Sequence, residues 1–140
     1  SEGASYLEIA EWIQRHCMNV EENLTELFRR IVFNIAVSNC DDHLRNHGFI
    51  YYPKGWTLSP AYDLTPDPAG YGLKLNISET DNALDYDLAL SIAPYLGIKK
   101  DNALEILKQI KSIVAEWRKV ATRYGIPKSE QDLVEDAFRY

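Results

Sequence analysis

Apolar residues recur at helical spacing in two stretches near the start of the chain. Over residues 6–17 the pattern predicts a short helix, with Ser5 as its N-cap. The second stretch carries one continuous apolar stripe at steps of three and four positions, made up of Leu24, Leu27, Phe28, Ile31, Val32 and Ile35. This stripe is the strongest helical pattern in the sequence and predicts a helix buried along one face.

Strand-like patterns begin after a polar segment. Residues 48–52 and 56–58 are rich in aromatic and branched side chains, and the turn-forming residues 53–55 separate them, which predicts two short strands joined as a hairpin. Prolines and a glycine make residues 60–70 a structured but irregular loop. Apolar residues then alternate over residues 73–77, and this alternation predicts a third short strand.

The remainder of the chain returns to helical patterns. We expect one helix over residues 86–96, a long helix from residue 102 to about 124 capped by Asp101, and a last helix opened by Ser129 with Asp132 in the capping-box position. The expected stops are Gly97, Gly125 and Pro127. The predicted fold class is mainly α (α+β), with residues 1–140 forming a single helix-dominated domain that carries a small sheet.

Composition and charge narrow the classes of function. The formal net charge of -6 works against nonspecific binding to nucleic acid or anionic lipid, because such binding needs clustered Lys and Arg. The two cysteines, Cys17 and Cys40, form no CxxC pair, and no apolar run approaches the length of a membrane span, so we expect a reduced, cytoplasmic setting. The chain begins with Ser1 and its single Met is Met18, which predicts a fragment of a longer protein.

The segment Asn39–His47 concentrates two carboxylates, two imidazoles and two amides directly after the buried helix. Such side chains contribute nothing to apolar burial, and close carboxylates repel unless a cation or a proton lies between them. One interpretation is a solvated loop whose Asn and Asp side chains cap helix ends. The other is a site that holds a ligand.

The order of residues suggests which ligand. Transfer of a phosphoryl group needs a carboxylate that accepts the hydroxyl proton, together with oxygen ligands that hold Mg²⁺ against the triphosphate. Asp41, Asn46 five positions later, and Asp63 after the hairpin supply that set. The hairpin should fold Asp63 back beside Asn46, and one carboxylate with one amide oxygen suffices where nucleotide phosphates complete the metal shell.

Two motifs carry a family resemblance. The segment Asp41–Phe49 (DDHLRNHGF), followed by Leu58–Asp63 (LSPAYD), closely resembles the HipA toxin kinases. The resemblance begins in the helix over residues 27–37 and extends through the C-terminal helices. It implies a fold like the helical C-lobe of a kinase, with a small β-hairpin beside the catalytic loop.

Carried over residue by residue, this resemblance implies that Asp41 is the catalytic carboxylate and that Asn46 and Asp63 bind Mg²⁺ with ATP as the cofactor. The loop is also similar to the Asp-x-His-x-x-Asn loop of phosphoinositide 3-kinase-like enzymes, which implies a catalytic place for His43 near the transferring phosphate. Arg45 could neutralise phosphate charge or pair with a neighbouring carboxylate.

The other polar residues of the two motifs have structural interpretations. Asn39 and His47 are expected to shape the loop by hydrogen bonds to the backbone. Cys40 is interpreted as a small buried filler, since no paired base accompanies it. Tyr62 would position the neighbouring Asp63, or fix the segment by packing.

The resemblance also implies partners and physiology. The acceptor would be a Ser or Thr hydroxyl of another protein, and an aminoacyl-tRNA synthetase is a candidate by analogy with these kinases. The kinase would be the toxin of a toxin-antitoxin module that arrests growth and promotes bacterial persistence. Its neutralising partner would be a helix-turn-helix antitoxin repressor, with no direct binding of nucleic acid and no membrane partner.

Two parts of a complete kinase do not appear in the sequence. No glycine-rich loop precedes the catalytic segment, and Lys54 lies in the predicted hairpin turn rather than on a buried strand. We therefore expect the 140-residue chain alone to transfer almost no phosphate. Two other functions stay open: a metal-dependent phosphohydrolase using Asp41, Asp42, His43 and His47, and a noncatalytic interaction domain that retains the loop.

Overall fold

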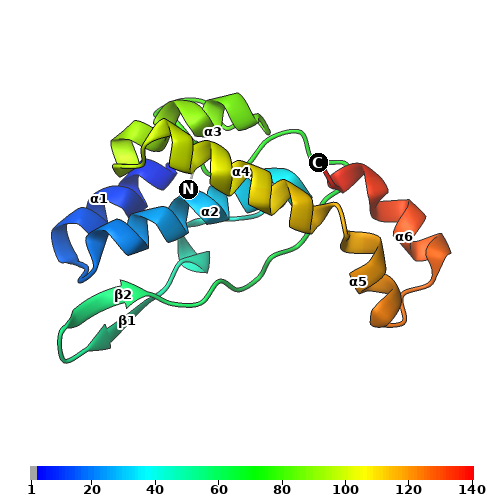
Figure 1. The fold of residues 1–140 in the computed structure, drawn as a ribbon, viewed down its shortest axis with the longest axis horizontal. Coiled ribbons are helices and arrows are strands. Elements are labelled where there is room, and N and C mark those ends of the chain that lie inside the picture. Colours follow the sequence, from blue (N-terminus) through cyan, green and yellow to red (C-terminus); the bar gives the residue numbers. More distant parts are fainter. Residues whose placement is uncertain (1–2) are drawn as a thin grey trace.

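Helix α2 (Val20–Val37) lies at the centre of the computed structural model, which describes residues 3–140 (Figure 1). Helices α1 (Tyr6–His16) and α4 (Lys100–Val114) pack along it. The six residues of the predicted apolar stripe are all buried in the main core. The prediction of a helix buried along one face is confirmed, and its burial supplies the main hydrophobic stabilisation of the domain.

Helix α1 begins at the predicted position. The Ser5 hydroxyl accepts a hydrogen bond from Leu7 N at 3.0 Å, and Glu8 closes a capping box with the Ser5 backbone. This arrangement satisfies amide groups that the first turn of a helix leaves without partners. It also fixes the start of the helix at Tyr6, whose side chain is fully buried.

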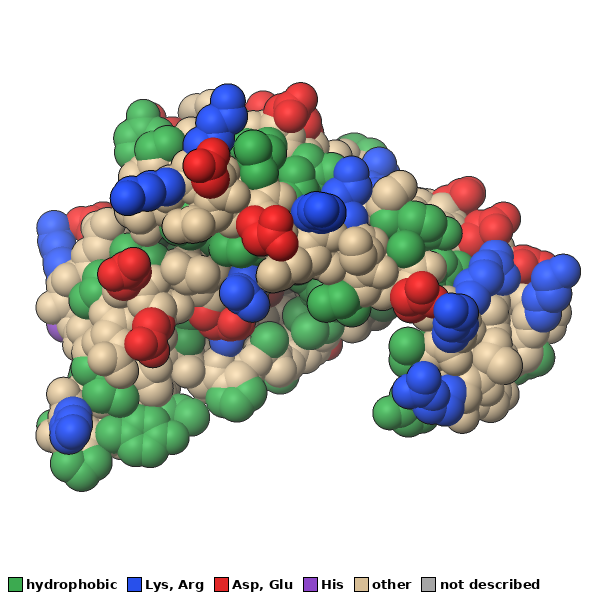
Figure 2. Space-filling view, viewed as in Figure 1, with side chains coloured by type: hydrophobic (Ala, Val, Ile, Leu, Met, Phe, Trp, Pro, Cys, Tyr) green, Lys and Arg blue, Asp and Glu red, His purple; other side chains and the backbone are tan. Residues whose placement is uncertain are grey.

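The predicted hairpin is confirmed as β1 (Phe49–Tyr52) paired antiparallel with β2 (Gly55–Leu58). Figure 1 shows it projecting from the helical layer, and Figure 2 shows apolar side chains gathered over it. Its base is attached to the helices, because Met18 N donates to the Trp56 carbonyl at 2.9 Å and the Trp12 ring lies 4.2 Å from that of Phe49. The hairpin therefore has a fixed position relative to α1.

The predicted third strand over residues 73–77 is wrong. Leu73, Leu75 and Ile77 are buried, as their alternation suggested, but within residues 3–140 this segment forms only isolated bridges, such as the one between Ser5 and Asn76. Two hydrogen bonds join Asn76 to Ala4 and Tyr6 at the start of α1. These bonds do not extend into a ladder between two strands. Burial alone was enough to produce the alternating pattern.

Helix α3 (Tyr86–Ile92) continues into a 3₁₀ turn, η2 (Ala93–Leu96), and Gly97 ends it with a left-handed φ of 71° as predicted. This agrees with the predicted helix over residues 86–96. The N-cap of the next helix differs from the prediction, because α4 begins after Lys99 and Asp101 lies within its first turn.

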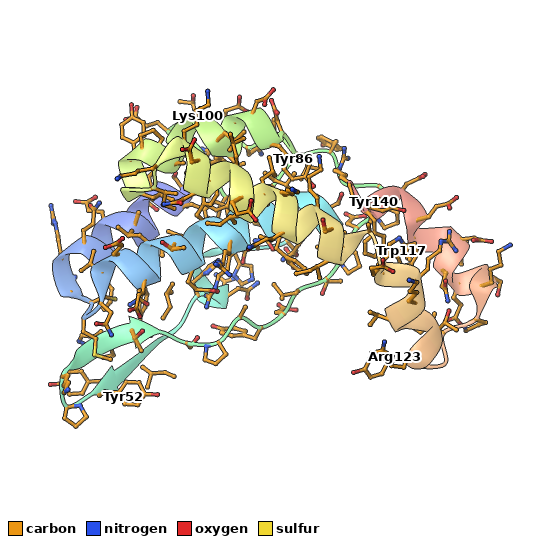
Figure 3. All side chains as sticks on the ribbon, in the orientation of Figure 1. Tyr52, Tyr86, Lys100, Trp117, Arg123 and Tyr140 are labelled. Carbon is orange, nitrogen blue, oxygen red and sulfur yellow. The ribbon has the colours of Figure 1, made fainter. Side chains whose placement is uncertain are left out.

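The predicted long helix to residue 124 is two helices, α4 and α5 (Trp117–Arg123). The end of α4 tightens, since Glu116 N donates to Ile113 O three residues back, and the Trp117 ring stacks on Phe138 with centroids 4.0 Å apart. Figure 3 marks Trp117 at this break. The stacking partner is distant in sequence, so periodicity could not reveal the break.

Helix α6 (Lys128–Val134) has Pro127 rather than Ser129 at its N-cap, so the predicted capping box is wrong. A 3₁₀ turn, η3 (Glu135–Ala137), follows, and the chain then returns to α2. There Arg139 N donates to the Ala36 carbonyl at 2.7 Å. Among residues 3–140, no helix has both the length and the apolar character to cross a bilayer.

Candidate active site

The predicted loop leaves α2 through a left-handed turn. Ser38 has φ 54°, and Asn39 N donates back to the Asn34 carbonyl at 2.9 Å, which closes the helix end. The Ser38 hydroxyl donates to the Ala137 carbonyl at 2.7 Å. The first residues of the loop are thus fixed by both the helix and the C-terminal segment, before the chain enters the 3₁₀ turn η1 (Leu44–Asn46).

Asp42 belongs to this loop, but its carboxylate points into the protein, and the residue is only 2% exposed. One of its oxygens, Oδ2, accepts hydrogen bonds from Tyr6 Oη at 2.5 Å and Asn34 Nδ2 at 3.0 Å, and lies 2.7 Å from His47 Nε2. Burial, and then the neighbouring Asp42 charge, raise the pKa of Tyr6 well above its ordinary value. The Tyr6 hydroxyl therefore stays protonated and donates a hydrogen bond to Asp42.

The His47 ring joins Asp42 to Arg30. Its Nδ1 atom lies 3.4 Å from Arg30 Nη1, and because a guanidinium can only donate, Nδ1 must accept and Nε2 must carry the proton toward Asp42. Arg30 also donates to Glu26 Oε2 at 2.8 Å and to the Ser59 carbonyl. A buried chain of polar contacts thus runs from α2 through the loop, and ends on both α1 and the segment after the hairpin.

Asp41, the neighbour of Asp42, has the opposite environment. Its side chain is exposed, and none of the hydrogen bonds or ion pairs formed within residues 3–140 engages its carboxylate. Arg45 in the same loop is exposed as well. Of the two adjacent carboxylates, that of Asp42 is bonded within the fold and that of Asp41 faces solvent.

Three buried polar atoms of the loop have no hydrogen-bond partner among residues 3–140. They are Asn39 Oδ1, His43 Nδ1 and Asn46 Nδ2, and Asn46 as a whole is only 6% exposed. Buried polar groups in folded proteins are nearly always satisfied, so a cluster of exceptions calls for a functional explanation. A polar ligand or an ordered water molecule at each of these atoms would provide the missing contacts.

The segment carrying Asp63 is hydrogen-bonded to the loop. Ser59 N donates to the Gly48 carbonyl at 2.9 Å, and Tyr62 Oη donates to the Arg45 carbonyl at 2.7 Å. Asp63 itself is exposed and has a left-handed φ of 59°, a conformation that Asp tolerates better than most residues. The segment that carries Asp63 therefore lies against the loop, held in part by the Tyr62 hydroxyl, while the placement of Asp63 beside Asn46 stays a prediction.

The same segment then passes under the start of the loop, along α2 (Figure 1). Asp67 N donates to the Ser38 carbonyl at 3.0 Å, and Gly70 lies so close to Cys40 that an added Cβ would be 2.3 Å from its sulfur. Burial raises the pKa of the Cys40 thiol, which disfavours the reactive thiolate. Cys40 packs against Gly70, but it is half-buried rather than the buried filler that the sequence suggested.

Residues 1–117 match the family model of the HipA-like C-terminal domain. The chain belongs to this family. It is also 31% identical over 160 aligned positions to a Haemophilus influenzae protein described as "Putative kinase", an alignment that covers 96% of this chain and 46% of the relative. The chain therefore spans about half the length of that relative.

A solved structure has the same fold. A chain in the complex of the Shewanella oneidensis MR-1 toxin-antitoxin system HipA, HipB and operator DNA superposes with a TM-score of 0.68. The match covers 79% of this chain and 27% of the other, at 21% sequence identity, so it supports the fold alone. Helix α6 and most of α5 lie beyond the residues that match the family model.

The site residues predicted from the sequence lie on two adjoining segments of this HipA-like fold. Four of them, Asp41, His43, Arg45 and Asn46, belong to the loop, and Asp63 belongs to the segment bonded to it. That Asn46 and Asp63 bind one magnesium ion, with Asp41 beside it, stays a prediction. Asn39 and His47 do shape the loop, but the expectation of backbone partners is wrong, because they bond to the side chains of Asn34 and Asp42.

Three contributors to the site went unnoticed in the sequence: Tyr6, Arg30 and Asn34. Asn34 gave a signal, since it is a polar residue within an apolar stripe and is only 1% exposed. Tyr6 and Arg30 gave no signal, because their hydrogen-bond partners, Asp42 and Ser59, lie many positions away in the sequence. The burial of Asp42 and its bonds to α1 and α2 were also missed, because the motif alone does not distinguish Asp42 from Asp41.

The residues of the site fit a magnesium ion carried by a nucleotide. The Asn46 amide oxygen accepts none of the hydrogen bonds formed within residues 3–140, and Asp63 is an exposed carboxylate on the adjoining segment, so two hard oxygen ligands are available, while the unpaired Asn46 Nδ2 is a donor for a phosphate or water oxygen. Magnesium prefers oxygen and keeps several nonprotein ligands, such as water and phosphate. The two residue types suit that mode of binding.

Proposed function

We propose that the chain is the catalytic C-terminal domain of a Ser/Thr protein kinase that transfers the γ-phosphoryl group of magnesium-bound ATP to a protein hydroxyl. The observation that supports this best is the contrast within the motif. Asp42 is buried with three polar side chains around one of its oxygens, whereas Asp41 is exposed and makes no such contact, on a loop to which the segment of Asp63 is hydrogen-bonded. Membership of the HipA-like family agrees with it.

In this proposal Asp41 orients the acceptor hydroxyl and takes its proton as the new phosphorus–oxygen bond forms and the bond to ADP breaks. Asn46 and Asp63 would hold Mg²⁺, which when bound neutralises charge on the phosphates. His43 and Arg45 would lie near the phosphates and stabilise their negative charge.

The wider biology belongs to the same proposal. The structural neighbour forms a complex with HipB and operator DNA, which supports a helix-turn-helix antitoxin as the partner of a longer protein that contains this chain. That protein would act as a toxin in the cytoplasm, with growth arrest as the outcome. An aminoacyl-tRNA synthetase remains the candidate substrate.

The test compares Asp41→Asn with Asp101→Asn in the full-length protein. Both changes remove one exposed carboxylate, and Asp101 lies in the first turn of α4, outside the proposed site. Labelled γ-phosphate from ATP is followed into the protein itself and into casein. We expect Asp41→Asn to lose about 100-fold or more, as for loss of a general base, while Asp101→Asn matches the wild type. Unchanged transfer in Asp41→Asn would overturn the proposal.

The same experiment separates the other candidate functions. A phosphohydrolase would release free phosphate without an acceptor, but its proposed ligands Asp42 and His47 are bonded to one another and to the core. A noncatalytic domain would leave transfer by the full-length protein independent of Asp41. Release of free phosphate with no labelled protein, lost in the Asp41→Asn variant, would favour the phosphohydrolase.

A further inference from the structure

The buried charge of Asp42 needs an explanation beyond filling space. Its side chain is 3% exposed and that of His47 is 4% exposed, so both polar groups are removed from water. Burying a carboxylate is costly unless donors surround it, and here Tyr6, Asn34 and His47 all converge on one oxygen. A buried network in which three donors meet one carboxylate oxygen fixes the relative positions of its members.

The network reaches each proposed functional residue through a near neighbour in the sequence. Asp42 follows Asp41, and His47 follows Asn46. The third connection is made by Arg30, which donates to the carbonyl of Ser59, at the start of the segment that carries Asp63. A movement of any one member would therefore shift a proposed metal ligand or the proposed base.

We infer that Asp42 and His47 are positioning residues, which, through the buried chain Arg30–His47–Asp42, hold Asp41 and Asn46 in register with Asp63. The inference rests on the proposed kinase function of the loop. The structure assigns the two halves of the His47 ring different tasks: Nε2 donates to Asp42 within the loop, and Nδ1 accepts from Arg30 and so connects the loop to the second motif.

Two substitutions of His47 separate these tasks. In His47→Gln the side-chain amide nitrogen can occupy the place of Nε2 and donate to Asp42, whereas in His47→Asn the shorter side chain places its amide oxygen near Nδ1 and loses Asp42. Because the contact with Asp42 at 2.7 Å is shorter than the contact with Arg30 at 3.4 Å, we expect the loss of Asp42 to matter more.

The experiment measures kcat and the Mg²⁺ concentration that gives half-maximal transfer in the full-length protein, with casein as acceptor. His47→Asn and Asp42→Asn should lower kcat by about 10-fold to 100-fold and raise the Mg²⁺ requirement, as is usual when residues that orient metal ligands are replaced. His47→Gln keeps the orienting bond to Asp42 but loses the longer contact with Arg30, so it should lose less than His47→Asn and stay within about 5-fold of the wild type.

A purely structural effect is excluded by a control of lowered stability. Ile106→Ala removes a buried side chain of α4 and should lower the melting temperature without changing kcat or the Mg²⁺ requirement at temperatures where the variant is folded. Folding of every variant is checked by circular dichroism at the assay temperature.

The outcomes distinguish the two proposals. If Asp41→Asn is inactive while folded His47→Asn and Asp42→Asn behave like Ile106→Ala, the positioning inference is wrong and the kinase function stands. If Asp41→Asn keeps wild-type transfer, the kinase proposal itself fails, whatever the His47 variants do. Equal losses in His47→Gln and His47→Asn would overturn the assignment of the decisive contact to Asp42.

Discussion

Two sides of the loop Asn39–His47 differ in burial and in bonding: its underside, which carries Asp42 and His47, and its exposed rim, which carries Asp41 with Asp63 on the adjoining segment. Asp41 and Asp42 are nevertheless adjacent in the sequence. On the underside, Asp42 is buried and bonded to two helices. On the rim, Asp41 and Asp63 are exposed carboxylates that face solvent. The same residue type thus fixes the loop in one place and is free for chemistry in the other, and burial decides which.

The largest effect on activity from the rim, besides that of Asp41, should come from Asp63. Asn keeps the shape and tolerates the left-handed backbone of this position, so Asp63→Asn should fold normally. Because it removes a charged magnesium ligand in our account, phosphate transfer by the full-length protein should fall by about 100-fold or more. A wild-type transfer rate in the folded variant would remove Asp63 from the site.

The largest effect on stability should come from the underside. Asp42→Ala leaves the donors of Tyr6, Asn34 and His47 buried without an acceptor, so the free energy of unfolding should fall by about 3 kcal/mol. The matched change Asp41→Ala should cost less than about 0.5 kcal/mol, as is usual for exposed positions. Urea denaturation measures both, and equal losses would contradict the contrast drawn here.

A smaller effect should appear where the segment after the hairpin passes under the loop. Gly70→Ala would place a methyl group 2.3 Å from the Cys40 sulfur and should destabilise the fold by about 1–3 kcal/mol. Removing the sulfur in Cys40→Ala, Gly70→Ala should recover much of that loss. A double mutant that is no more stable than Gly70→Ala would show that this contact is not the cause.

The smallest effect concerns the Tyr6 hydroxyl, which donates to Asp42 and accepts from Asn34 Nδ2 at 2.9 Å. Tyr6→Phe removes this hydroxyl and should cost about 1 kcal/mol, because Asn34 Nδ2 keeps its bond to Asp42. Since the pKa of Tyr6 is raised in the folded state, folding favours its protonated form, and this contribution is full below the unfolded pKa of about 10 and declines at higher pH. The variant should therefore lose less stability than the wild type above pH 10, a difference that alkaline denaturation detects.

The parts of the fold that could be predicted depend on local pattern. The apolar stripe of α2, the capping box at Ser5 and the hairpin between residues 48 and 58 all rest on residues within a few positions of one another. The order of Asp41, Asn46 and Asp63 was likewise readable, whereas their convergence on one site stays a prediction.

The remainder depends on contacts between distant residues. Stacking of Trp117 on Phe138 accompanies the break that divides the predicted long helix in two, and no periodic pattern records it. The bond from Tyr6 to Asp42 crosses 36 positions, so the sequence could not show which of the two adjacent aspartates is buried. The sequence therefore located the loop, and the structure showed which of its side chains are buried and which are exposed.

The central claim is that Asp41, Asn46 and Asp63 serve one magnesium–nucleotide site. A crystal structure of the full-length protein with Mg²⁺ and a nonhydrolysable ATP analogue tests it most directly. We predict one ion within roughly 2.1 Å of Asn46 Oδ1 and of an Asp63 carboxylate oxygen, with the Asp41 carboxylate beside the γ-phosphate. An ion coordinated elsewhere, with Asp63 directed away from the loop, would contradict the account.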